Sequence, residues 1–189
     1  MGFAARLAII VNGNFSQIKN MIETKRLLLK PLSYDQILKY IKADDSLEAE
    51  LYLNKTSRTI DPELKEAFEQ TILPNVADTT KDYLYSTLWT AISKEENKMV
   101  GDLCFVGEPN DLGEIEIGYG TYEAFRKQGF MTEAVAGMIT WAKDQAKIKS
   151  ILANTEKSNN ASFSVLEKND FIRVGETGTM INWKLVLKQ

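Results

Sequence analysis

The chain has no histidine and only one cysteine among its 189 residues. Without histidine, neither a Ser-His-Asp nor a Cys-His catalytic arrangement can form, and histidine metal sites are excluded. The one cysteine, Cys104, cannot form a disulfide within the chain. Because it lies in the apolar run 103–106, we expect a buried structural thiol rather than a nucleophile. Much hydrolase and metalloenzyme chemistry is thereby excluded, and no metal site is predicted.

Basic residues are not in excess either. The chain has 23 Lys and Arg against 26 Asp and Glu, a net charge of -3 and a pI of about 5.2. Proteins that bind nucleic acid or anionic membranes usually carry a basic excess, so neither partner is expected. No apolar run approaches the roughly 18 residues of a membrane span. A single cysteine suits a reducing compartment, and the expected location is the cytoplasm.

The composition is that of one ordinary globular domain, with 44% hydrophobic and 26% charged residues. No repeat, linker or low-complexity segment divides the chain. We expect residues 21–189 to form a single domain and residues 1–20 to be an N-terminal extension of uncertain order. The domain is expected to be a monomer or a homodimer.

The stretch 114–145 predicts a strand, a polar turn and a long helix. In its first seven residues, Glu and Gly alternate with Ile and Tyr, which is the period of a strand with two different faces. Gly118 and Gly120 share one face and leave room for something to approach the backbone. Beyond the turn, apolar residues recur at helical spacing and predict a stripe packed on a sheet, namely Val135, Met138, Ile139, Ala142 and Ala146.

A basic turn, 126–132, lies between this strand and this helix. The first N–H groups of a helix have no partner within it and lie at the positive end of its dipole, so the turn predicts an anion site. Gly129 would let the chain approach a phosphate closely, and Arg126 and Lys127 add positive charge. On this stretch alone, a plain turn with two solvated cations is an alternative. Neither the P-loop pattern nor the three-glycine dinucleotide pattern is present.

Two motifs carry a resemblance to a known family. The segment 126–131 resembles the R-x-x-G-x-[GA] acyl-CoA pyrophosphate signature of the GNAT acetyltransferases, with Met131 replacing the usual small last residue. The run 129–134 is similar to the G-[YF]-[AM]-T-E-A variant of the branch that includes the RimJ and RimL N-terminal acetyltransferases. Downstream, 159–171 resembles the N-x-[AP]-S-x-x-V-L-E-K-x-G-F segment of the same branch. On these motifs the chain is identified as a member of that family.

The resemblance implies an α/β (α+β) fold with a mixed, mostly antiparallel twisted sheet of about seven strands, a central parallel splayed pair and about four helices. It also implies acetyl-CoA as the co-substrate, lying in the V between the two parallel strands. Its pantetheine would pair with one strand, and its pyrophosphate would lie on the amides of the turn. The predicted cofactor-binding residues are Tyr119, Gly120, Thr121, Arg126, Lys127, Gln128, Gly129, Phe130, Met131, Thr132 and Asn159.

Such a site acylates an amine by direct attack on the thioester, without a covalent enzyme intermediate. The attacking amine must be neutral, which is easier for an α-amino group, with a pKa of about 7.7 to 8.0, than for a lysine at about 10.4. Glu116 is the predicted base, through a water, because it shares a face with Gly118 and Gly120. Glu114 is the second candidate. The alternative, that both are solvent-facing strand carboxylates, stays open.

The chain departs from the family pattern at two positions. Leu166 stands where many other GNAT branches have a tyrosine that protonates the departing thiolate. The resemblance to RimL offers Ser162 for that role, although its hydroxyl is equally suited to satisfying the first turn of a helix. Asp170 stands where the family usually has a helix-ending glycine, often in the left-handed conformation, which Asp can adopt.

The remaining signals complete the expected fold. Ser33 and Gln36 have capping-box spacing, Asp61 and Pro62 open a second helix, and Pro74 ends it. By the resemblance, these helices and the linker 46–60 form the acceptor side of the cleft. Strands are expected at 26–30, 84–92, 99–106, 114–120, 150–155, 171–175 and 179–187.

The sequence therefore predicts an acetyl-CoA-dependent N-acetyltransferase whose acceptor is a protein or peptide N-terminal amine. One alternative is a small-molecule amine acetyltransferase acting on a polyamine or an antibiotic. Another is a catalytically idle acyl-CoA-binding module. Specificity depends on the variable region 46–80 and the closing hairpin, where spacing does not identify the acceptor.

Overall fold

The computed structural model describes residues 20–60 and 62–188. Apart from Asn20, the predicted N-terminal extension lies outside the described residues. Asp61, the predicted cap of the second helix, also lies outside them.

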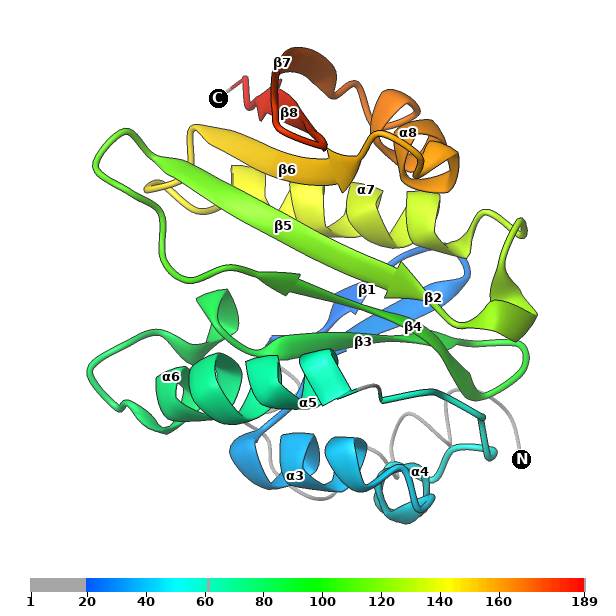
Figure 1. Cartoon of the computed structure of the whole chain (residues 1–189). Coiled ribbons are helices and arrows are strands. Elements are labelled where there is room, and N and C mark those ends of the chain that lie inside the picture. Colours follow the sequence, from blue (N-terminus) through cyan, green and yellow to red (C-terminus); the bar gives the residue numbers. More distant parts are fainter. Residues whose placement is uncertain (1–19, 61, 189) are drawn as a thin grey trace.

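Eight strands form one sheet in the order β1-β2-β3-β4-β5-β6-β8-β7 (Figure 1). Neighbouring strands are antiparallel except for β5 and β6, which are parallel. The strands are β1 (Ile22–Glu23), β2 (Leu27–Pro31), β3 (Leu88–Ser93), β4 (Lys98–Phe105), β5 (Glu114–Thr121), β6 (Ser150–Glu156), β7 (Ile172–Thr177) and β8 (Met180–Val186). The predicted mixed sheet with a central parallel pair is confirmed, with the short β1 in addition.

Helices cover both faces of the sheet (Figure 1). They are α3 (Tyr34–Lys42), α4 (Ser46–Glu50), α5 (Pro62–Ala67), a π-helical turn (Phe68–Ile72), α6 (Leu73–Ala77), α7 (Phe130–Lys143) and α8 (Asn160–Glu167). Two short 3-10 turns span Tyr83–Tyr85 and Glu123–Phe125. The helices α3 to α6 lie on one side of the sheet and α7 lies on the other, with α8 next to α7.

Each helical layer has its own hydrophobic core. On the α7 side, Trp89, Trp183 and Met138 are almost fully buried against the sheet. On the other side, Phe68 and Ile37 are buried in a second core between α3 to α6 and the strands β2, β3 and β4. Truncating a side chain of this size in a packed core costs about 3–5 kcal/mol, so the two cores fix both helical layers on the sheet.

The start of α3 follows the sequence prediction. The Ser33 hydroxyl accepts a hydrogen bond from the Gln36 backbone N–H at 3.3 Å, and the Gln36 side-chain oxygen accepts one from the Ser33 N–H at 3.1 Å. This reciprocal pair is the predicted capping box. The linker that follows was expected to be irregular over 46–60, but it contains the additional helix α4.

Pro74 was predicted to end the second helix, and this prediction is wrong. The helix runs without a break from α5 to the end of α6 at Ala77. In the π-helical turn before Pro74, the Leu73 N–H donates to the Phe68 carbonyl, five residues back. Proline has no N–H, and its ring clashes with the preceding turn of a regular α-helix. The wider π turn accommodates that ring.

Three other element boundaries differ from the prediction. The strand expected at 84–92 starts only at Leu88, because Asp82 caps a 3-10 turn by accepting from the Leu84 N–H at 3.0 Å. Pro31 lies inside β2, where its nitrogen faces away from β3. Ala146, expected on the apolar stripe of the long helix, is exposed beyond the end of α7.

Candidate active site

The parallel strands β5 and β6 separate partway along their length. Their pairing covers Glu114 with Ser150, Ile115 with Ile151, and Glu116 with Leu152. Beyond Glu116 and Leu152 the two strands continue unpaired and diverge, as Figure 1 shows. This is the V-shaped opening that the family resemblance implies.

One backbone edge of β5 faces this opening. On the other side, β5 pairs with β4, and the Val106 N–H donates to the Glu116 carbonyl at 2.9 Å. Because hydrogen-bonding residues alternate in an antiparallel pair, the even-numbered residues of β5 bond to β4. Tyr119 and Thr121 therefore direct their N–H and C=O groups toward β6, which has separated from β5 here. An extended ligand can pair with such an edge like an added strand.

The N-terminus of α7 lies at the open end of β5. Gly129 precedes the helix with φ 77° and has no side chain to cap it. The first bond within the helix runs from the Glu133 N–H to the Gly129 carbonyl at 3.2 Å. The N–H groups of Phe130, Met131 and Thr132 therefore have no acceptor within the helix. An uncapped N-terminus of a 14-residue helix is suited to a phosphate group.

The side chains of this turn divide into two groups. Arg126 and Lys127 are exposed, and neither forms an ion pair with a described residue. Lys127 has φ 61°, a left-handed conformation that costs a non-glycine residue roughly 1–2 kcal/mol. Phe130 and Met131 are buried in the α7 core, so only their backbone is available to a ligand. Positive charge and free N–H groups thus coincide at one end of the V.

Arg26, which the sequence analysis did not single out, holds this turn in place. Its Nε donates to Glu133 Oε2 at 2.6 Å and its Nη1 donates to the Gln128 carbonyl at 3.0 Å. Its guanidinium also lies over the Phe130 ring, 4.6 Å from the centroid. Burial alone would raise the pKa of Glu133, but the hydrogen bonds from Arg26 and Thr24 lower it. The Glu133 charge is thereby compensated next to a predicted anion site.

The helix α8 forms the other wall of the V. Asn159 caps it, with Oδ1 accepting from the Ser162 N–H at 3.1 Å. The Tyr119 hydroxyl of β5 donates to the Ser162 carbonyl at 3.2 Å and so links the two walls. Burial raises the pKa of Tyr119 to about 12. Within the described residues, the half-buried Ser162 hydroxyl has no hydrogen bond, whereas Leu166 is fully buried in the core.

The two predicted bases have different surroundings. Glu116 is the last residue of β5 that pairs with β6, so it lies at the narrow end of the V. Its Oε1 accepts a hydrogen bond from Asn154 Nδ2 at 3.0 Å. Glu114 forms an ion pair with Lys184 at 2.7 Å. The Lys184 hydrogen bond, followed by that of Asn110, lowers the pKa of Glu114. Glu114 is therefore the weaker of the two candidates.

Cys104 lies on β4 with its thiol free of any disulfide. Burial raises the pKa of the Cys104 thiol to about 11, so it is not a thiolate at neutral pH. Among the described residues, no group of three or more Cys, Asp or Glu side chains could hold a metal ion. None of the described helices is long and apolar enough to cross a bilayer.

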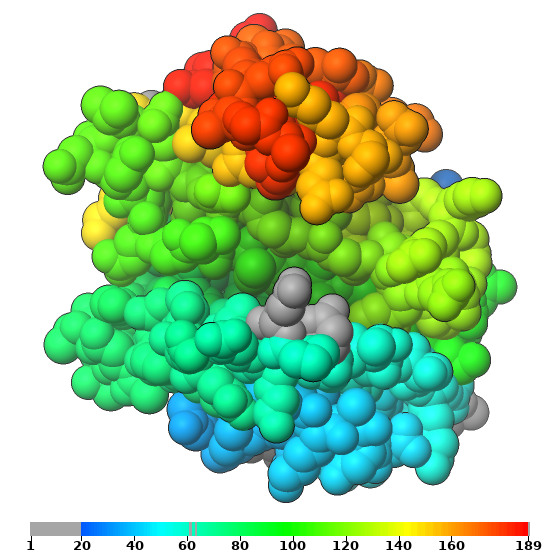
Figure 2. Space-filling model, in the orientation of Figure 1, coloured from blue at the N-terminus to red at the C-terminus, as the bar shows by residue number. Residues whose placement is uncertain are grey.

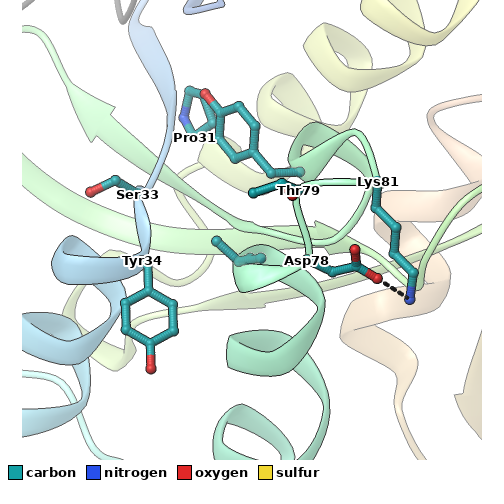
Figure 3. Close-up of a pocket in the computed structure, with 8 residues that line it drawn as sticks. Pro31, Ser33, Tyr34, Asp78, Thr79 and Lys81 are labelled. Atoms are coloured by element: carbon teal, nitrogen blue, oxygen red, sulfur yellow. Dashed lines mark ion pairs between the residues drawn. The ribbon is translucent and has the colours of Figure 1, made fainter.

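A hollow of about 490 Å³ lies away from the V, between the end of β2 and the loop after α6. Figure 3 shows Pro31, Ser33 and Tyr34 on one side of it, with Asp78, Thr79 and Lys81 on the other. Asp78 and Lys81 form an ion pair across 3.7 Å on that second side. Pro31, which lines the hollow, is the last residue of β2. Arg26, which contacts the turn before α7, directly precedes the first residue of β2. The hollow and the V therefore lie toward opposite ends of this strand.

The residues of the V fit the co-substrate that the resemblance implies. A free strand edge suits an extended pantetheine, and an uncapped helix N-terminus with two exposed cations suits a pyrophosphate. Gly129 lets a phosphate group approach the backbone closely, because it has no side chain. The space where its Cβ would be is open except for the Arg26 guanidinium, at 3.5 Å.

Comparison with known proteins agrees with this geometry. The family model described as Acetyltransferase (GNAT) domain matches residues 26–172. A Bacillus subtilis (strain 168) relative, the uncharacterized N-acetyltransferase YjdG, is 28% identical over 171 residues, which cover 89% of this chain and 99% of the relative.

Two solved structures share the fold. RimL, the ribosomal L7/L12 alpha-N-protein acetyltransferase in complex with coenzyme A, superposes with a TM-score of 0.63 at 19% identity, covering 89% of this chain and 98% of RimL. The aminoglycoside acetyltransferase AAC(6')-Ib, also with coenzyme A, gives a TM-score of 0.58 at 15% identity over 85% and 94%. The chain belongs to the GNAT acetyltransferase family and is an acetyl-CoA-dependent N-acetyltransferase.

Proposed function

We propose that the chain acetylates the α-amino group of a protein or peptide N-terminus. The observation that carries the proposal is the likeness to RimL, an alpha-N-protein acetyltransferase, over 89% of this chain, together with the opening between β5 and β6. An α-amino group also needs the least help to become neutral. The proposed location is the cytoplasm, which suits a chain whose one cysteine is a free thiol.

For acetyl-CoA we propose the placement expected from the sequence. The pantetheine pairs with the β5 edge at Tyr119 and Thr121, and the pyrophosphate lies on the 126–132 turn. Gly120, also predicted to bind the cofactor, directs its backbone groups to β4 and contributes only the space left by its missing side chain. Support comes from the outward N–H groups at the start of α7 and from the exposed Arg126 and Lys127. Asn159 acts through the backbone, since its side chain is engaged in capping α8.

The proposed chemistry is direct transfer. The amine nitrogen attacks the thioester carbonyl carbon, a C–N bond forms, and the C–S bond breaks as the thiolate leaves. Backbone N–H groups of β5 stabilise the oxygen that gains charge. Two carboxylates on the face of Gly118 and Gly120 can take up the amine proton, Glu116 and the Asp102 side chain of β4. Ser162 is the proposed donor of a proton to the thiolate.

An acceptor panel tests this function. The full chain is incubated with acetyl-CoA and one acceptor at a time, and products are identified by mass spectrometry. The acceptors are peptides with free N-termini, the same peptides N-terminally blocked but carrying lysine, spermidine and an aminoglycoside. We expect acetylation of free N-termini and none of the blocked peptides. Preferred acetylation of spermidine or of an aminoglycoside would favour the small-molecule alternative, to which the AAC(6')-Ib likeness lends support. Acetyl-CoA binding without any product would instead support an idle binding module.

A further inference from the structure

A row of polar residues crosses the sheet on the face covered by α3 to α6. In this row Lys30 of β2 is opposite Thr90 of β3, Thr90 is opposite Asp102 of β4, and Asp102 is opposite Gly120 of β5. The row ends beside the β5 edge that borders the V. Lys30, Thr90 and Asp102 are all buried, which is unusual for a lysine and an aspartate.

The Asp102 carboxylate is hydrogen-bonded mainly through one of its two oxygens, and the Tyr122 and Thr90 hydroxyls near it also lower its pKa. The Tyr40 hydroxyl of α3 donates to its Oδ2 at 2.6 Å, and the Tyr122 hydroxyl lies 3.4 Å from that of Tyr40. The other oxygen, Oδ1, is buried without a hydrogen-bond partner among the described residues, as is the Thr90 hydroxyl. A buried carboxylate oxygen without a partner carries a desolvation penalty that a donor would remove.

The charge around Asp102 is also incomplete. The nearby Arg58 is paired with Glu48, and its guanidinium lies 4.7 Å from the centre of the Tyr40 ring. Both members of that pair are almost fully buried. Asp102 itself forms no ion pair with a described residue. Because buried charges are normally paired, a cation is the ligand that this position lacks.

Space for such a cation lies next to Asp102. A Cβ built on Gly120 would meet no atom within 4 Å, and one on Gly118 would meet only the Cys104 sulfur, at 3.4 Å. Paired residues of an antiparallel sheet point to the same face with Cα atoms about 5.5 Å apart, so this space adjoins the Asp102 side chain. Figure 2 shows the surface hollowed between the light green of β5 and the teal of α5 and α6.

We propose that Asp102 binds the ammonium group of the acceptor and accepts its proton, with Tyr40 as the residue that positions the carboxylate. This proposal rests on the function proposed above. One N–H bond of the ammonium breaks and one O–H bond forms on Asp102, which leaves the amine nitrogen with a lone pair. That lone pair attacks the thioester carbon and the C–S bond breaks. The Ser162 hydroxyl gives its proton to the thiolate and is reprotonated by the second proton that the nitrogen loses.

The location of Asp102 favours it over Glu116. Glu116 is four residues before Gly120, roughly 13 Å along the strand, and its carboxylate already accepts from Asn154. Asp102 is directly opposite Gly120, between the two β5 residues whose backbone faces the V. Burial raises the pKa of Asp102 to about 6, against the lowering effect of the Tyr40 hydrogen bond. A base with such a pKa is ionised at neutral pH and returns its proton readily.

The titratable and charged groups that surround Asp102 come from every neighbouring element. They are Tyr40 of α3, Glu48 of α4, Arg58 of the linker, Lys30 of β2, Cys104 of β4, Glu116 of β5, and Tyr122 directly after β5. Burial raises the pKa of both tyrosines above their ordinary value, so neither competes with Asp102 for the role of base.

The test compares wild type with Asp102→Asn, using the peptide that the wild type acetylates fastest. Because ammonium and carboxylate react together, wild-type kcat/KM should form a bell, rising near pH 6 and falling as the amine titrates near pH 8. Asp102→Asn should lose roughly 100-fold or more at pH 7 and show only a rise toward high pH. The hydrogen bond from Tyr40 lowers the pKa of Asp102. Tyr40→Phe removes this bond, so the pKa of Asp102 and the acidic limb of the profile should both move to higher pH. The exposed Asp111→Asn removes the same charge and should behave as wild type.

A binding arm separates this proposal from the proposed function. Calorimetry measures the affinity of coenzyme A, and then of a free-N-terminus peptide for the protein saturated with coenzyme A. Asp102→Asn should bind coenzyme A normally and the peptide at least tenfold more weakly. Peptide binding equal to wild type, or an unchanged bell, would overturn the role of Asp102. A wild type that binds the peptide but acetylates nothing would contradict the proposed function, while the binding comparison still decides the case of Asp102.

Discussion

Arg26 and Glu133 are 107 residues apart in the sequence and are joined by two hydrogen bonds of 2.6 Å, one from the Arg26 backbone N–H and one from its Nε. The same arginine donates to the Gln128 carbonyl at 3.0 Å. The start of β2 is thereby tied to the turn that precedes α7. The geometry of the proposed pyrophosphate site depends on a residue remote from it in the sequence.

Removing this tie should weaken acetyl-CoA binding. We expect Arg26→Ala to reduce the affinity roughly tenfold, about 1.4 kcal/mol, because the turn loses its support and Glu133 loses its compensating charge. Glu133→Gln in the Arg26→Ala background should recover part of that loss, since the uncompensated charge is gone. Calorimetry measures both. Lys39→Ala, which breaks a surface ion pair on α3, is the control. Equal affinities in all four proteins would contradict the role of Arg26.

Asp170 offers a prediction about stability alone. The helix α8 ends with the Phe171 N–H donating to Leu166 and the Asp170 N–H donating to Glu167, the bond pattern of a Schellman motif. Asp170 occupies the left-handed position with φ 62°, as the sequence predicted. Asp170→Gly should stabilise the fold by roughly 0.5–1 kcal/mol, because glycine adopts this conformation without the steric cost. Urea denaturation measures the change, and a destabilised variant would contradict the assignment.

The raised pKa of Asp102 predicts how stability depends on pH. Its pKa rises from the ordinary value of 3.8 to about 6, so the folded state binds more protons than the unfolded state between these values. Stability contributed by the protonated form is therefore lost as the pH rises through this window, by about 3 kcal/mol. Asn cannot ionise, so the stability of Asp102→Asn relative to wild type should increase by about 2 kcal/mol from pH 4 to pH 7, most of that amount.

Measuring this difference at each pH cancels the titration of the other carboxylates, such as Glu133 and Glu114, whose pKa values are lowered. Denaturant unfolding at four or five pH values is sufficient. A difference that stays constant across the window would mean that Asp102 titrates at its ordinary value.

Ser162 can be tested against a matched serine on the same helix. If its hydroxyl protonates the thiolate, Ser162→Ala should lower kcat roughly 100-fold or more and leave the acetyl-CoA affinity unchanged. The exposed Ser164→Ala should have no effect. Both are followed by thiol release. An unchanged kcat in Ser162→Ala would leave only the structural role in the first turn of α8, where its N–H is bound by Asn159.

Local signals in the sequence were enough to predict most of the fold. Alternation at 114–120, the turn at 126–132 and the capping box at Ser33 are short-range patterns, and the structure has the predicted strand, turn and helix start. Pro74 was misjudged because a π-helical turn, which no local pattern announced, makes room for its ring. The 3-10 turn before β3 was missed because Asp82 and Trp89 divert the backbone through side-chain hydrogen bonds.

Only part of the candidate site could be predicted from the sequence. The backbone anion site follows from a glycine before a helix, whereas the roles of Arg26 and Asp102 depend on contacts across 107 and 62 residues. For Asp102 one signal was present, a lone aspartate within the otherwise apolar strand 99–106. Glu116 was favoured because it shares a face with the glycines. Only the strand register shows that Asp102 lies closer to Gly120.

The central claim, that the 126–132 turn and the start of α7 hold the pyrophosphate of acetyl-CoA, is tested most directly at Gly129. Calorimetry of acetyl-CoA binding compares wild type with Gly129→Asp and Gly129→Asn, which make the same backbone demand at φ 77° and differ only in charge. The account predicts that the Asp variant binds at least roughly tenfold more weakly than the Asn variant, because its carboxylate repels the pyrophosphate. Equal affinities of the two variants, both folded by circular dichroism, would contradict it.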